Sequence, residues 1–380
     1  MAGVKSGPNP REAAISRVAA GASIEDTAQH FNIPPERLRR WVGTAATPGD
    51  GASQRRRGKQ ATIIDLAEHT GLSKSVVSRA LRGQYGVSAD AQARVQAAVE
   101  ELGYVFNAAA QNLSAHRTNT IGVLVRDASA PFYGEMQSAL QKRGSSLAQR
   151  VFITSGALDN HDERRALEDL IALRVDGLIV CSGRLPLEEV KRFSSKFPVV
   201  VAGRPDVDPL VDSVFGDEDE GARRLAEHLM SLGHRRVAVL QPPDQVSPIL
   251  HRRTGIMEGY LRDGGVDVIV ITTTSPQDVG RTVSRLDESV TAVMCPNDRY
   301  AVAVLVGLKD SPGRLAVTGF DGVGGISNSL IDLTTWKQPI ERVGSAAVDR
   351  LMQLVRQRDA AVVHLAIPGQ MHVGRTTQAL

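Results

Sequence analysis

Residues 62–83 read Thr62-Ile-Ile-Asp-Leu-Ala-Glu-His-Thr-Gly-Leu-Ser-Lys-Ser-Val-Val-Ser-Arg-Ala-Leu-Arg-Gly83, and this stretch decides the fold of the region around it. Thr62 and Asp65 have the spacing of a capping box, which predicts that a helix begins there. Gly71 tolerates the left-handed backbone in which such a helix ends. The sequence therefore predicts a first short helix between Thr62 and Gly71.

Two more helices are expected directly after it. Ser73 can cap a helix over residues 74–81, and Ser88 can cap a third helix, which Gly103 would close. Two short helices joined by a tight turn and followed by a supporting helix are typical of a helix-turn-helix. These residues alone do not exclude the alternative, which is a small structural three-helix bundle with an ordinary solvated face.

The outward face of the second predicted helix carries small hydrogen-bonding side chains and two cations. Such side chains suit the major groove of DNA, where Ser pairs with several base edges and Arg or Lys favours guanine. The candidate DNA-binding residues of this region are Thr62, Ser73, Lys74, Ser75, Ser78 and Arg79.

A short segment follows, from Asn107 to Leu113, and a helix of this length is marginal by itself in water. At this point the sequence resembles the lactose/galactose-repressor (LacI/GalR) family. The residues that carry the resemblance are Asp65-Leu66-Ala67, Gly71-Leu72-Ser73, Val76-Val77-Ser78-Arg79, Val87-Ser88, Leu102-Gly103-Tyr104, Asn107 and Ala110-Gln111-Asn112-Leu113.

The resemblance implies a role for the short segment. In the family it is the hinge helix, which folds on DNA as a dimeric pair and inserts a leucine, here Leu113, into the minor groove. Apolar wedges of this kind kink the duplex. Asn107, Ala110 and Leu113 are therefore further candidate DNA-binding residues, whereas the alternative for Leu113 is a linker leucine packed on the core.

Length and composition limit the classes of protein. A chain of 380 residues with 42% apolar residues favours two or three domains with sizeable cores. No apolar run approaches membrane-spanning length, and no signal-peptide pattern opens the chain. Cys181 and Cys295 each end an apolar run, which favours buried thiols over a disulfide or metal site. We expect a cytoplasmic, nucleoid-associated protein without cofactor or metal.

The positive charge is concentrated near the N-terminus. Residues 1–58 contain nine Lys and Arg and five Asp and Glu, whereas residues 59–118 contain six and five. The net charge of the whole chain is only +3. A nucleic-acid partner is therefore expected at the N-terminal end.

Residues 1–43 precede the point at which the repressor family normally begins. Ser23 and Asp26 repeat the capping-box spacing, and three short amphipathic helices can be placed here. The pattern is similar to the small transposase or homeodomain-like helix-turn-helix, with Arg39 and Arg40 pointing outward as candidate DNA contacts. The alternative is a three-helix module that contacts another protein.

Residues 44–58 are expected to be a linker, because they are rich in Gly, Ala, Ser, Thr and Pro and lack an apolar face. The basic run Arg55-Arg56-Arg57-Gly58-Lys59 can track phosphates, with Arg56 as the candidate contact. A solvated basic arm is the alternative.

From Thr118 onward, short apolar runs alternate with stretches of helical periodicity. Continuous apolar strands between helices predict parallel sheets that are covered on both faces. About 260 residues exceed one such sheet, so we expect two α/β subdomains with a ligand cleft between them. The predicted strands lie at residues 121–125, 151–153, 177–180, 199–201, 237–240, 268–271, 292–294 and 315–317.

The family resemblance extends through this region to about residue 376. It implies a periplasmic-binding-protein-like core, in which the chain crosses between subdomains about three times, here expected near Gly203, Asp321 and Gln338. The family-like stretches are residues 131–133, 174–179, 232–238, 296–298, 317–321, 333–335 and 337–338.

The expected fold class is therefore multidomain, with all-α helix-turn-helix heads and an α/β core of two subdomains. The N-terminal module takes residues 1–43 and the linker 44–58. The DNA-binding domain takes residues 59–106, the hinge and linker 107–118, and the core 119–380. Within the core, subdomain 1 is expected at about 119–203 and 339–358, and subdomain 2 at about 204–338 and 359–376.

Residues at strand ends line the cleft of such a fold. Carboxylates, an amide and an arginine can pair with adjacent hydroxyls while an aromatic ring packs on an apolar sugar face, which favours a sugar or polyol, or a nucleoside. The candidate ligand-binding residues are Asp127, Phe132, Tyr133, Arg252, Asn297, Asp321 and Gln338. Structural alternatives are a surface helix for Arg252, a turn for Asp321 and an N-cap for Asn297.

Residues 241–248 depart from the family pattern, because they are proline-rich where a glycine-containing cleft loop is usual. Pro248 cannot donate a backbone hydrogen bond, which puts the effector contacts of this loop in doubt. No leucine heptad follows residues 374–377, so a dimer is expected rather than a tetramer.

We expect a ligand-responsive transcription regulator, most simply a repressor, that binds a pseudo-palindromic operator as a dimer. A solute-binding receptor of the same cleft fold is the first alternative, but it would need an export signal and has no use for residues 62–113. An enzyme is not expected, because no phosphate-binding loop, nucleophile elbow or metal-spaced His or Cys set is present. A DNA-processing protein that uses the N-terminal module is the remaining alternative, although no acidic catalytic core accompanies it.

Overall fold

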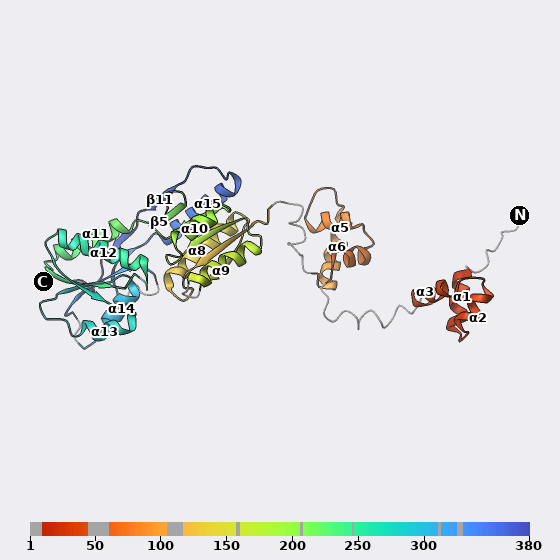
Figure 1. Ribbon diagram of the computed structural model, residues 1–380, viewed down its shortest axis with the longest axis horizontal. Coiled ribbons are helices and arrows are strands. Elements are labelled where there is room, and N and C mark those ends of the chain that lie inside the picture. The colour runs from red at the N-terminus through yellow and green to blue at the C-terminus, as the bar shows by residue number, and fades with distance from the viewer. Residues whose placement is uncertain are drawn as a thin grey trace. The chain divides into compact units, whose positions relative to one another are not determined.

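The computed structural model describes residues 10–44, 61–104, 117–156, 160–205, 208–244, 247–310, 313–324 and 330–380 (Figure 1). The chain divides into two compact units, residues 1–107 and 108–380. The expected hinge residues Asn107, Ala110 and Leu113 lie outside the described residues, as does Arg56.

The first unit begins with three helices around a very small core. The helices are α1 (Pro10–Ala19), α2 (Ile24–His30) and α3 (Pro35–Thr44). Each helix contributes one fully buried residue to the core, which consists of Ala14, Ala28 and Leu38.

Three further helices form the predicted helix-turn-helix. They are α4 (Ile63–Thr70), α5 (Lys74–Leu81) and α6 (Ala89–Leu102). The capping box at Thr62 is confirmed, since the backbone N–H of Thr62 donates to Asp65 Oδ2 at 2.8 Å and that of Asp65 donates to Thr62 Oγ1 at 3.4 Å. Gly71 has a φ of 66°, as expected for the end of α4. Leu66, Val77, Ala80, Val95 and Ala98 form the buried core.

Subdomain 1 of the second unit is a six-stranded parallel sheet in the order β11-β5-β4-β3-β1-β2. Its strands are β1 (Thr120–Val125), β2 (Arg150–Ser155), β3 (Gly177–Cys181), β4 (Val199–Ala202), β5 (Asp212–Gly216) and β11 (His364–Ile367). Its helices are α8 (Pro131–Ser146), α9 (Asn160–Ala172), α10 (Leu187–Ser194) and α15 (Ile340–Arg356).

Side chains along β1 point alternately to the two faces of the sheet, and each face is covered by helices. Ile121, Val123 and Val125 pack with residues of α8 and α15, whereas Leu124 packs on the other face with residues of α9 and α10. Because every residue of β1 is buried, the strand reads as a continuous apolar run in the sequence.

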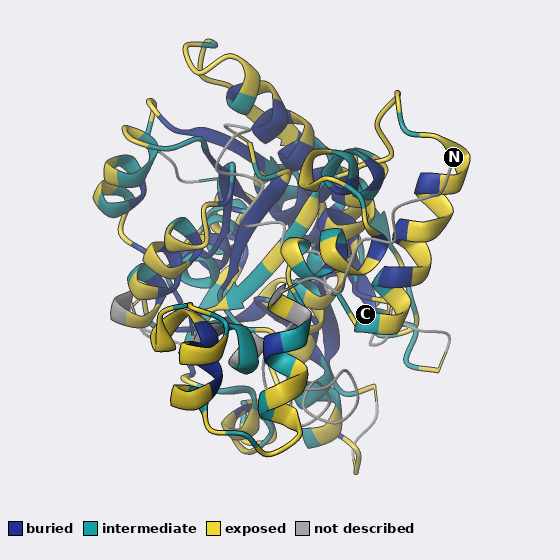
Figure 2. Cartoon of the chain, turned by 90° about the vertical axis from the view of Figure 1, so that its right-hand side faces the viewer, coloured by how far each residue is buried: buried dark blue, intermediate teal, exposed yellow. Residues whose placement is uncertain are grey.

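Subdomain 2 is a second six-stranded sheet in the order β12-β10-β9-β8-β6-β7, in which only β12 is antiparallel to its neighbour. Its strands are β6 (Arg236–Gln241), β7 (Asp267–Thr272), β8 (Ala292–Met294), β9 (Ala316–Asp321), β10 (Thr334–Lys337) and β12 (Gln370–His372). Its helices are α11 (Glu218–Ser231), α12 (Pro248–Asp263), α13 (Pro276–Val283) and α14 (Asp298–Gly307). In Figure 2, dark-blue buried strands of the α/β core are seen among helices that carry yellow exposed residues.

The crossings between the subdomains differ from the expected ones in two of three places. Strand β5 pairs with β4, and β11 pairs with β5, so residues 212–216 and 364–367 belong to subdomain 1. The chain therefore crosses at residues 216–218 rather than at Gly203, and again between β11 and β12. The crossing expected at Asp321 is absent, because β9 and β10 are neighbours in one sheet. The crossing at Gln338 is confirmed.

The two cysteines are buried free thiols, as expected. Across the described ranges, no three His, Cys, Asp or Glu side chains come together in a way that could hold a metal ion. Of the helices that the structure describes, none is long and apolar enough to cross a membrane.

Candidate functional site

A cavity of about 190 Å³ lies between the two subdomains, at the carboxyl ends of strands from both sheets. This volume is below the roughly 300–1,000 Å³ of pockets for drug-sized molecules, which favours a small ligand. Subdomain 1 contributes Arg126, Asp127, Ala130, Pro131, Phe132, Tyr133 and Gly203. Subdomain 2 contributes Ser247, Ile249, Leu250, Arg253, Pro276, Asn297, Asp298, Arg299, Tyr300, Asp321 and Val323.

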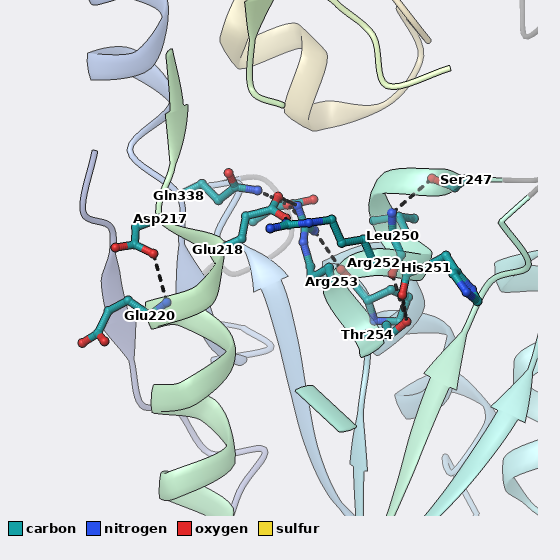
Figure 3. A network of polar contacts seen from close by, with 12 residues as sticks. Asp217, Glu218, Glu220, Ser247, Leu250, His251, Arg252, Arg253, Thr254 and Gln338 are labelled. Atoms are coloured by element: carbon teal, nitrogen blue, oxygen red, sulfur yellow. Dashed lines mark hydrogen bonds and ion pairs between the residues drawn. The ribbon is translucent and has the colours of Figure 1, made fainter. Parts of the chain in front are cut away.

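The wall from subdomain 2 is built on a buried arginine, Arg253 of α12 (Figure 3). One guanidinium nitrogen donates to Asp321 Oδ1 at 3.2 Å and to the carbonyl of Pro296 at 2.9 Å. The other donates to Glu218, and the guanidinium lies over the ring of Phe320 at 4.1 Å. Only 4% of Arg253 and 4% of Glu218 are exposed, so these charges are removed from water and neutralise one another.

Asp321 connects this cluster to a crossing between the subdomains. Its carboxylate also accepts a hydrogen bond from Gln338 Nε2 at 2.8 Å, and Gln338 lies where the chain returns to subdomain 1. Burial raises the pKa of Asp321 to about 6, although the charge of Arg253 acts in the opposite direction. Asp321 has a φ of 107°, so its position is held by these contacts against an unfavourable backbone conformation.

Asp298 lies beside this cluster at the start of α14. Its carboxylate accepts hydrogen bonds from Thr335 Oγ1 at 2.6 Å and from the backbone N–H of Val323 at 3.1 Å. Burial, assisted by the nearby charge of Asp321, raises the pKa of Asp298 to about 7. The neighbouring Asn297 accepts from the backbone N–H of Tyr300 at 3.1 Å, so it caps α14 and also lines the cavity.

The wall from subdomain 1 is simpler. Asp127 accepts hydrogen bonds from Ser129, from the hydroxyl at 2.6 Å and from the backbone N–H at 2.9 Å. Partial burial would raise the pKa of Asp127, but these bonds and the charges of Arg299 and Arg126 lower it overall. Phe132 and Tyr133 pack edge to face, with ring centroids 5.3 Å apart. This wall therefore offers a half-exposed carboxylate beside an aromatic surface.

Polar contacts cross the cleft between the two walls. Arg126 Nη1 donates to Ser247 Oγ at 2.8 Å, and Arg299 Nη1 lies 3.8 Å from Asp127 Oδ2. Outside the cavity, the backbone N–H of Gly324 donates to Glu135 Oε1 at 3.0 Å. These contacts join the subdomains directly, in addition to the three chain crossings.

The structure brings most of the predicted ligand-binding residues together. The cavity is lined by Asp127, Phe132, Tyr133, Asn297 and Asp321 but not by Arg252 or Gln338. Arg252 is exposed, with Nη1 3.8 Å from Glu218, and Gln338 reaches the site only through Asp321.

The cavity-lining arginine is Arg253, which the sequence reasoning passed over. The helical period could have shown this, because Arg253, Met257 and Leu261 follow one another at four-residue steps on the buried face of α12. An arginine in phase with buried apolar residues points inward, and its neighbour Arg252 then points to solvent.

The proline-rich loop contributes to the cavity at its C-terminal end, where Ser247 lines the cavity. Pro248 occupies the first position of α12, where a backbone N–H has no partner within the helix in any case. Ser247 caps the helix, accepting from the backbone N–H of Leu250 at 3.5 Å, and also receives the bond from Arg126.

The predicted base-reading helix, α5, presents its start to solvent. Lys74 and Ser75 are exposed, whereas Ser78 and Arg79 are partly buried. Ser73 caps the helix by accepting from the backbone N–H of Val76 at 3.3 Å. The hydroxyls of Thr62 and Ser73 are thus engaged in capping, yet both residues remain exposed, as Lys74 does.

Two exposed residues that follow α5 escaped the sequence reasoning. Arg82 donates from Nη2 to Ser78 Oγ at 2.8 Å and so lies along the same helix face. Among the described residues of the head, Tyr85 is the most exposed large hydrophobic side chain, at 103% of its reference area. The sequence could have identified Tyr85, because it is an aromatic residue in a turn that is flanked by glycines.

Among the candidate residues of the N-terminal module, Arg39 Nη2 lies 2.6 Å from Glu25 Oε1 on α2. Arg40 belongs to α3, but its side chain is outside the described set.

Comparison with known proteins gives matches over most of the chain. Residues 62–107 match the model for bacterial regulatory proteins of the lacI family. Residues 118–375 match the model for periplasmic binding proteins and the sugar binding domain of the LacI family. Neither match includes the N-terminal module.

Individual relatives agree with these models. The chain is 28% identical over 334 residues to the maltose regulon regulatory protein MalI of Escherichia coli, a match that covers 82% of this chain and 98% of that protein. It is 29% identical over 337 residues to the lactose operon repressor of Escherichia coli, covering 84% and 92%. The crystal structure of the lac repressor dimer bound to operator and the anti-inducer ONPF superimposes with a TM-score of 0.74 at 27% identity, covering 84% of this chain and all of that one.

Proposed function

The chain belongs to the lacI family of bacterial regulatory proteins, and from this premise we propose how its residues carry out DNA-binding transcription regulation. The protein is a ligand-responsive regulator, and repression is the mode that the relatives favour, since the lactose operon repressor is among them. The family consists of regulators, and we propose no enzymatic activity. The observation that carries the proposal is the presence, in one chain, of the family's DNA-binding head and of a cavity between two subdomains that is lined by both charged and apolar side chains.

DNA binding is assigned to the head, over residues 59–106. Helix α5 enters the major groove, where Lys74 and Ser75 at its exposed start can reach base edges. The other proposed DNA contacts of this region are Thr62, Ser73, Ser78 and Arg79. Because Arg82 and Tyr85 are exposed, we propose them as further contacts, to the phosphate backbone.

Residues 107–118 are proposed as the hinge and linker. By analogy with the family, Asn107, Ala110 and Leu113 contact the minor groove, and Leu113 is the wedge that bends a pseudo-palindromic operator. A dimer presents two heads to the two halves of such a site. The lac repressor relative is a dimer on its operator, which supports this arrangement.

The cavity of the core, residues 119–380, is proposed to bind a small polyol, most simply a sugar. Asp127 and Asn297 offer hydrogen-bond acceptors and a donor, Arg253 with Asp321 offers a fixed charged pair, and Phe132 offers an aromatic surface. Adjacent hydroxyls can bridge a carboxylate and a guanidinium, while an apolar sugar face covers a ring. Tyr133 completes the proposed site. Gln338 acts through Asp321 rather than by contact, whereas Arg252 lies outside the site.

The effector is proposed to act by changing how the subdomains meet. The contact between Arg126 and Ser247 and that between Asp127 and Arg299 both cross the cavity, so a bound ligand must replace or reinforce them. A ligand shifts an equilibrium only through its differential affinity for the two states. The subdomain boundaries then follow the sheets, with residues 117–217 and 339–368 in subdomain 1 and the remainder of the core in subdomain 2.

A DNA-binding regulator works where the chromosome is, so we assign the protein to the cytoplasm and the nucleoid. Residues 1–43 are proposed as a separate module and 44–58 as its linker, with Arg39, Arg40 and Arg56 as its DNA contacts. A solute-binding receptor of the same cleft fold is disfavoured, because such a receptor has no use for the head at residues 62–107.

Selection of genomic fragments with the purified full chain, followed by fluorescence anisotropy on the selected site, tests operator binding. We expect a palindrome with a central CG step and a loss of affinity of at least tenfold for Leu113→Ala. Binding without dyad symmetry, and without dependence on Leu113, would overturn the assignment to the head and hinge.

Thermal stability of the full chain in the presence of monosaccharides and nucleosides tests the cavity. A ligand at 100 times its Kd raises the unfolding free energy by about 2.7 kcal/mol. We expect Asp127→Asn to reduce this stabilisation, whereas Arg252→Ala, outside the cavity on α12, leaves it unchanged. An equal loss in both variants would place the ligand elsewhere.

A further inference from the structure

We propose that the N-terminal module, whose described helices lie within residues 10–44, binds duplex DNA that flanks the operator and does so through α3. The proposal rests on operator binding by the head, because the head brings the flanking DNA within reach. The module lies outside both family matches. Three lines of argument support the proposal: the geometry of the turn, the chemistry of the exposed surface and the length of the chain between the modules.

The turn between α2 and α3 repeats the chemistry of the turn between α4 and α5. Asn32, with a φ of 49°, ends α2 in the left-handed conformation, as Gly71 does for α4 at 66°. The backbone N–H of Ile33 donates to the carbonyl of Ala28 at 2.9 Å and closes the end of α2. Pro35 then begins α3, where its fixed φ suits the first helical turn. A second helix that follows such a turn is the one that enters the major groove in helix-turn-helix proteins.

The outward face of α3 carries arginines while its inward face carries apolar residues. Leu38 is fully buried, whereas Arg37 and Arg39 on either side of it are exposed. Glu25 of α2 lies 2.6 Å from Arg39 and so orients its guanidinium without covering it, since 57% of that side chain is exposed. Cations presented by the second helix of the turn are suited to phosphates and to guanine.

The same surface lacks what a protein partner needs. No large apolar side chain is exposed among those described between residues 11 and 42. Trp41, the largest aromatic residue of the module, is partly buried and has the guanidinium of Arg11 over its ring at 5.6 Å. Protein interfaces have a fully buried, apolar and aromatic centre. The exposed charges of the module are mixed, since Glu25, Asp26 and Glu36 accompany Arg11, Arg17, Arg37 and Arg39. On α3, however, the exposed arginines outnumber its one carboxylate, Glu36, which suits a helix that binds nucleic acid.

The length of the connecting segment limits where the second site can be. Sixteen residues, 45–60, join Thr44 to Ala61, and they span at most roughly 60 Å at about 3.3–3.6 Å per residue. At about 3.4 Å per base pair this is roughly 18 base pairs of duplex. Tethering makes the second binding event intramolecular and raises affinity without any new contact by the head.

Anisotropy with the full chain and the selected operator tests the proposal. The operator core is kept constant while the natural flanks are trimmed from 25 to 4 base pairs on each side. We expect trimming to weaken binding at least tenfold. The double substitution Arg37→Ala and Arg39→Ala should remove this dependence on flank length and should lower the slope of log affinity against log salt by about 0.9 for each lost phosphate contact.

Arg17→Ala is the matched control, because Arg17 is an exposed arginine of α1 on the same module. It should retain the dependence on flank length, and circular dichroism of each variant verifies the helices. Equal affinity for long and short flanks in the wild-type chain would overturn the proposal. An effect of Arg17→Ala as large as that of the α3 substitutions would overturn it too, since nonspecific charge would then explain both.

Hydroxyl-radical footprinting separates failure of this proposal from failure of the proposed function. Protection of the palindrome alone, with no protected phosphates in the flanks, means that the head binds and the N-terminal module does not. Protection outside the palindrome, within about 18 base pairs and lost with the α3 substitutions, supports the proposal. Absence of any protected palindrome would instead contradict operator binding by the head.

Discussion

Both walls of the cleft lie at the carboxyl ends of sheet strands, yet they differ in how far their charged side chains are buried. The wall from subdomain 2 buries Glu218, Arg253 and Asp321 against one another, with Asp298 close by. The wall from subdomain 1 keeps one carboxylate, Asp127, half exposed and satisfied by an adjacent serine. A buried charge needs partners from several elements, whereas a half-exposed one needs only its own loop.

This difference indicates which wall is preorganised. The contacts of Arg253 join α11, α12 and β9, and Gln338 adds the crossing after β10, so this wall is held by parts of the chain that are distant in sequence. The other wall can exchange its contacts with water or ligand at little cost. We therefore expect subdomain 2 to present a rigid charged pair and subdomain 1 to adapt.

The largest expected effect comes from removing the partner that the buried carboxylates share. Arg253→Met leaves Glu218 and Asp321 buried without their cation, which should lower the unfolding free energy by roughly 3–5 kcal/mol. Arg252→Met is the control, because an exposed pair 3.8 Å from Glu218 should contribute less than about 1 kcal/mol. Urea denaturation measures both. Equal losses would mean that burial does not distinguish the two arginines.

The second effect is a pH dependence of opposite sign on the two walls. Folding raises the pKa of Asp298 to about 7, so the stability that its protonated form contributes is complete below about pH 4 and is lost as pH rises through 7. Asp298→Asn should therefore gain stability relative to the wild type between pH 4 and pH 8. The gain is at most about 4 kcal/mol, at about 1.4 kcal/mol per pKa unit.

Asp127 is the matched control for this experiment. Its pKa is lowered in the folded protein, so its contribution is present at neutral pH and is lost as pH falls through the folded pKa. Asp127→Asn should accordingly lose stability relative to the wild type as pH rises to about 4, because the folded pKa lies below the ordinary carboxyl value. Thermal denaturation from pH 2 to pH 8 measures both variants, because the change for Asp127→Asn falls below about pH 4 and that for Asp298→Asn falls above it. Slopes of the same sign would show that the two walls do not differ in this respect.

The smallest effect concerns the bond that joins the walls. Ser247→Ala removes the hydroxyl that accepts from Arg126 across the cleft, a contribution of about 0.5–1.5 kcal/mol. It also removes the cap of α12, so exchange in α12 alone would reflect the lost cap and only a joint effect reports the cross-cleft bond. We expect faster hydrogen exchange in the first turn of α8 and in the first turn of α12 together. Ser129→Ala, which removes a bond within one wall, should affect only the loop before α8. Exchange that rises on one side alone in Ser247→Ala would contradict a cross-cleft role.

Features that depend on near neighbours were predictable from the sequence. The capping box of Thr62, the left-handed turn at Gly71 and the apolar runs of the central strands each follow from residues a few positions apart. Their physical causes are local hydrogen bonds, backbone sterics and the period of side chains along an element. The same rules placed Asp127 and Asn297 at strand ends, and both line the cavity.

Only the tertiary structure decided the rest. Strand β5, Asp-Ser-Val-Phe-Gly, is too polar and short to be recognised, and it becomes a strand because β4 and β11 satisfy its backbone on both sides. Arg253 rather than Arg252 lines the cavity because its partners on α11 and β9 are 35 and 68 residues away in the chain. Sequence thus determined the elements through short-range chemistry, whereas burial among distant segments determined the subdomain boundaries and the charges at the site.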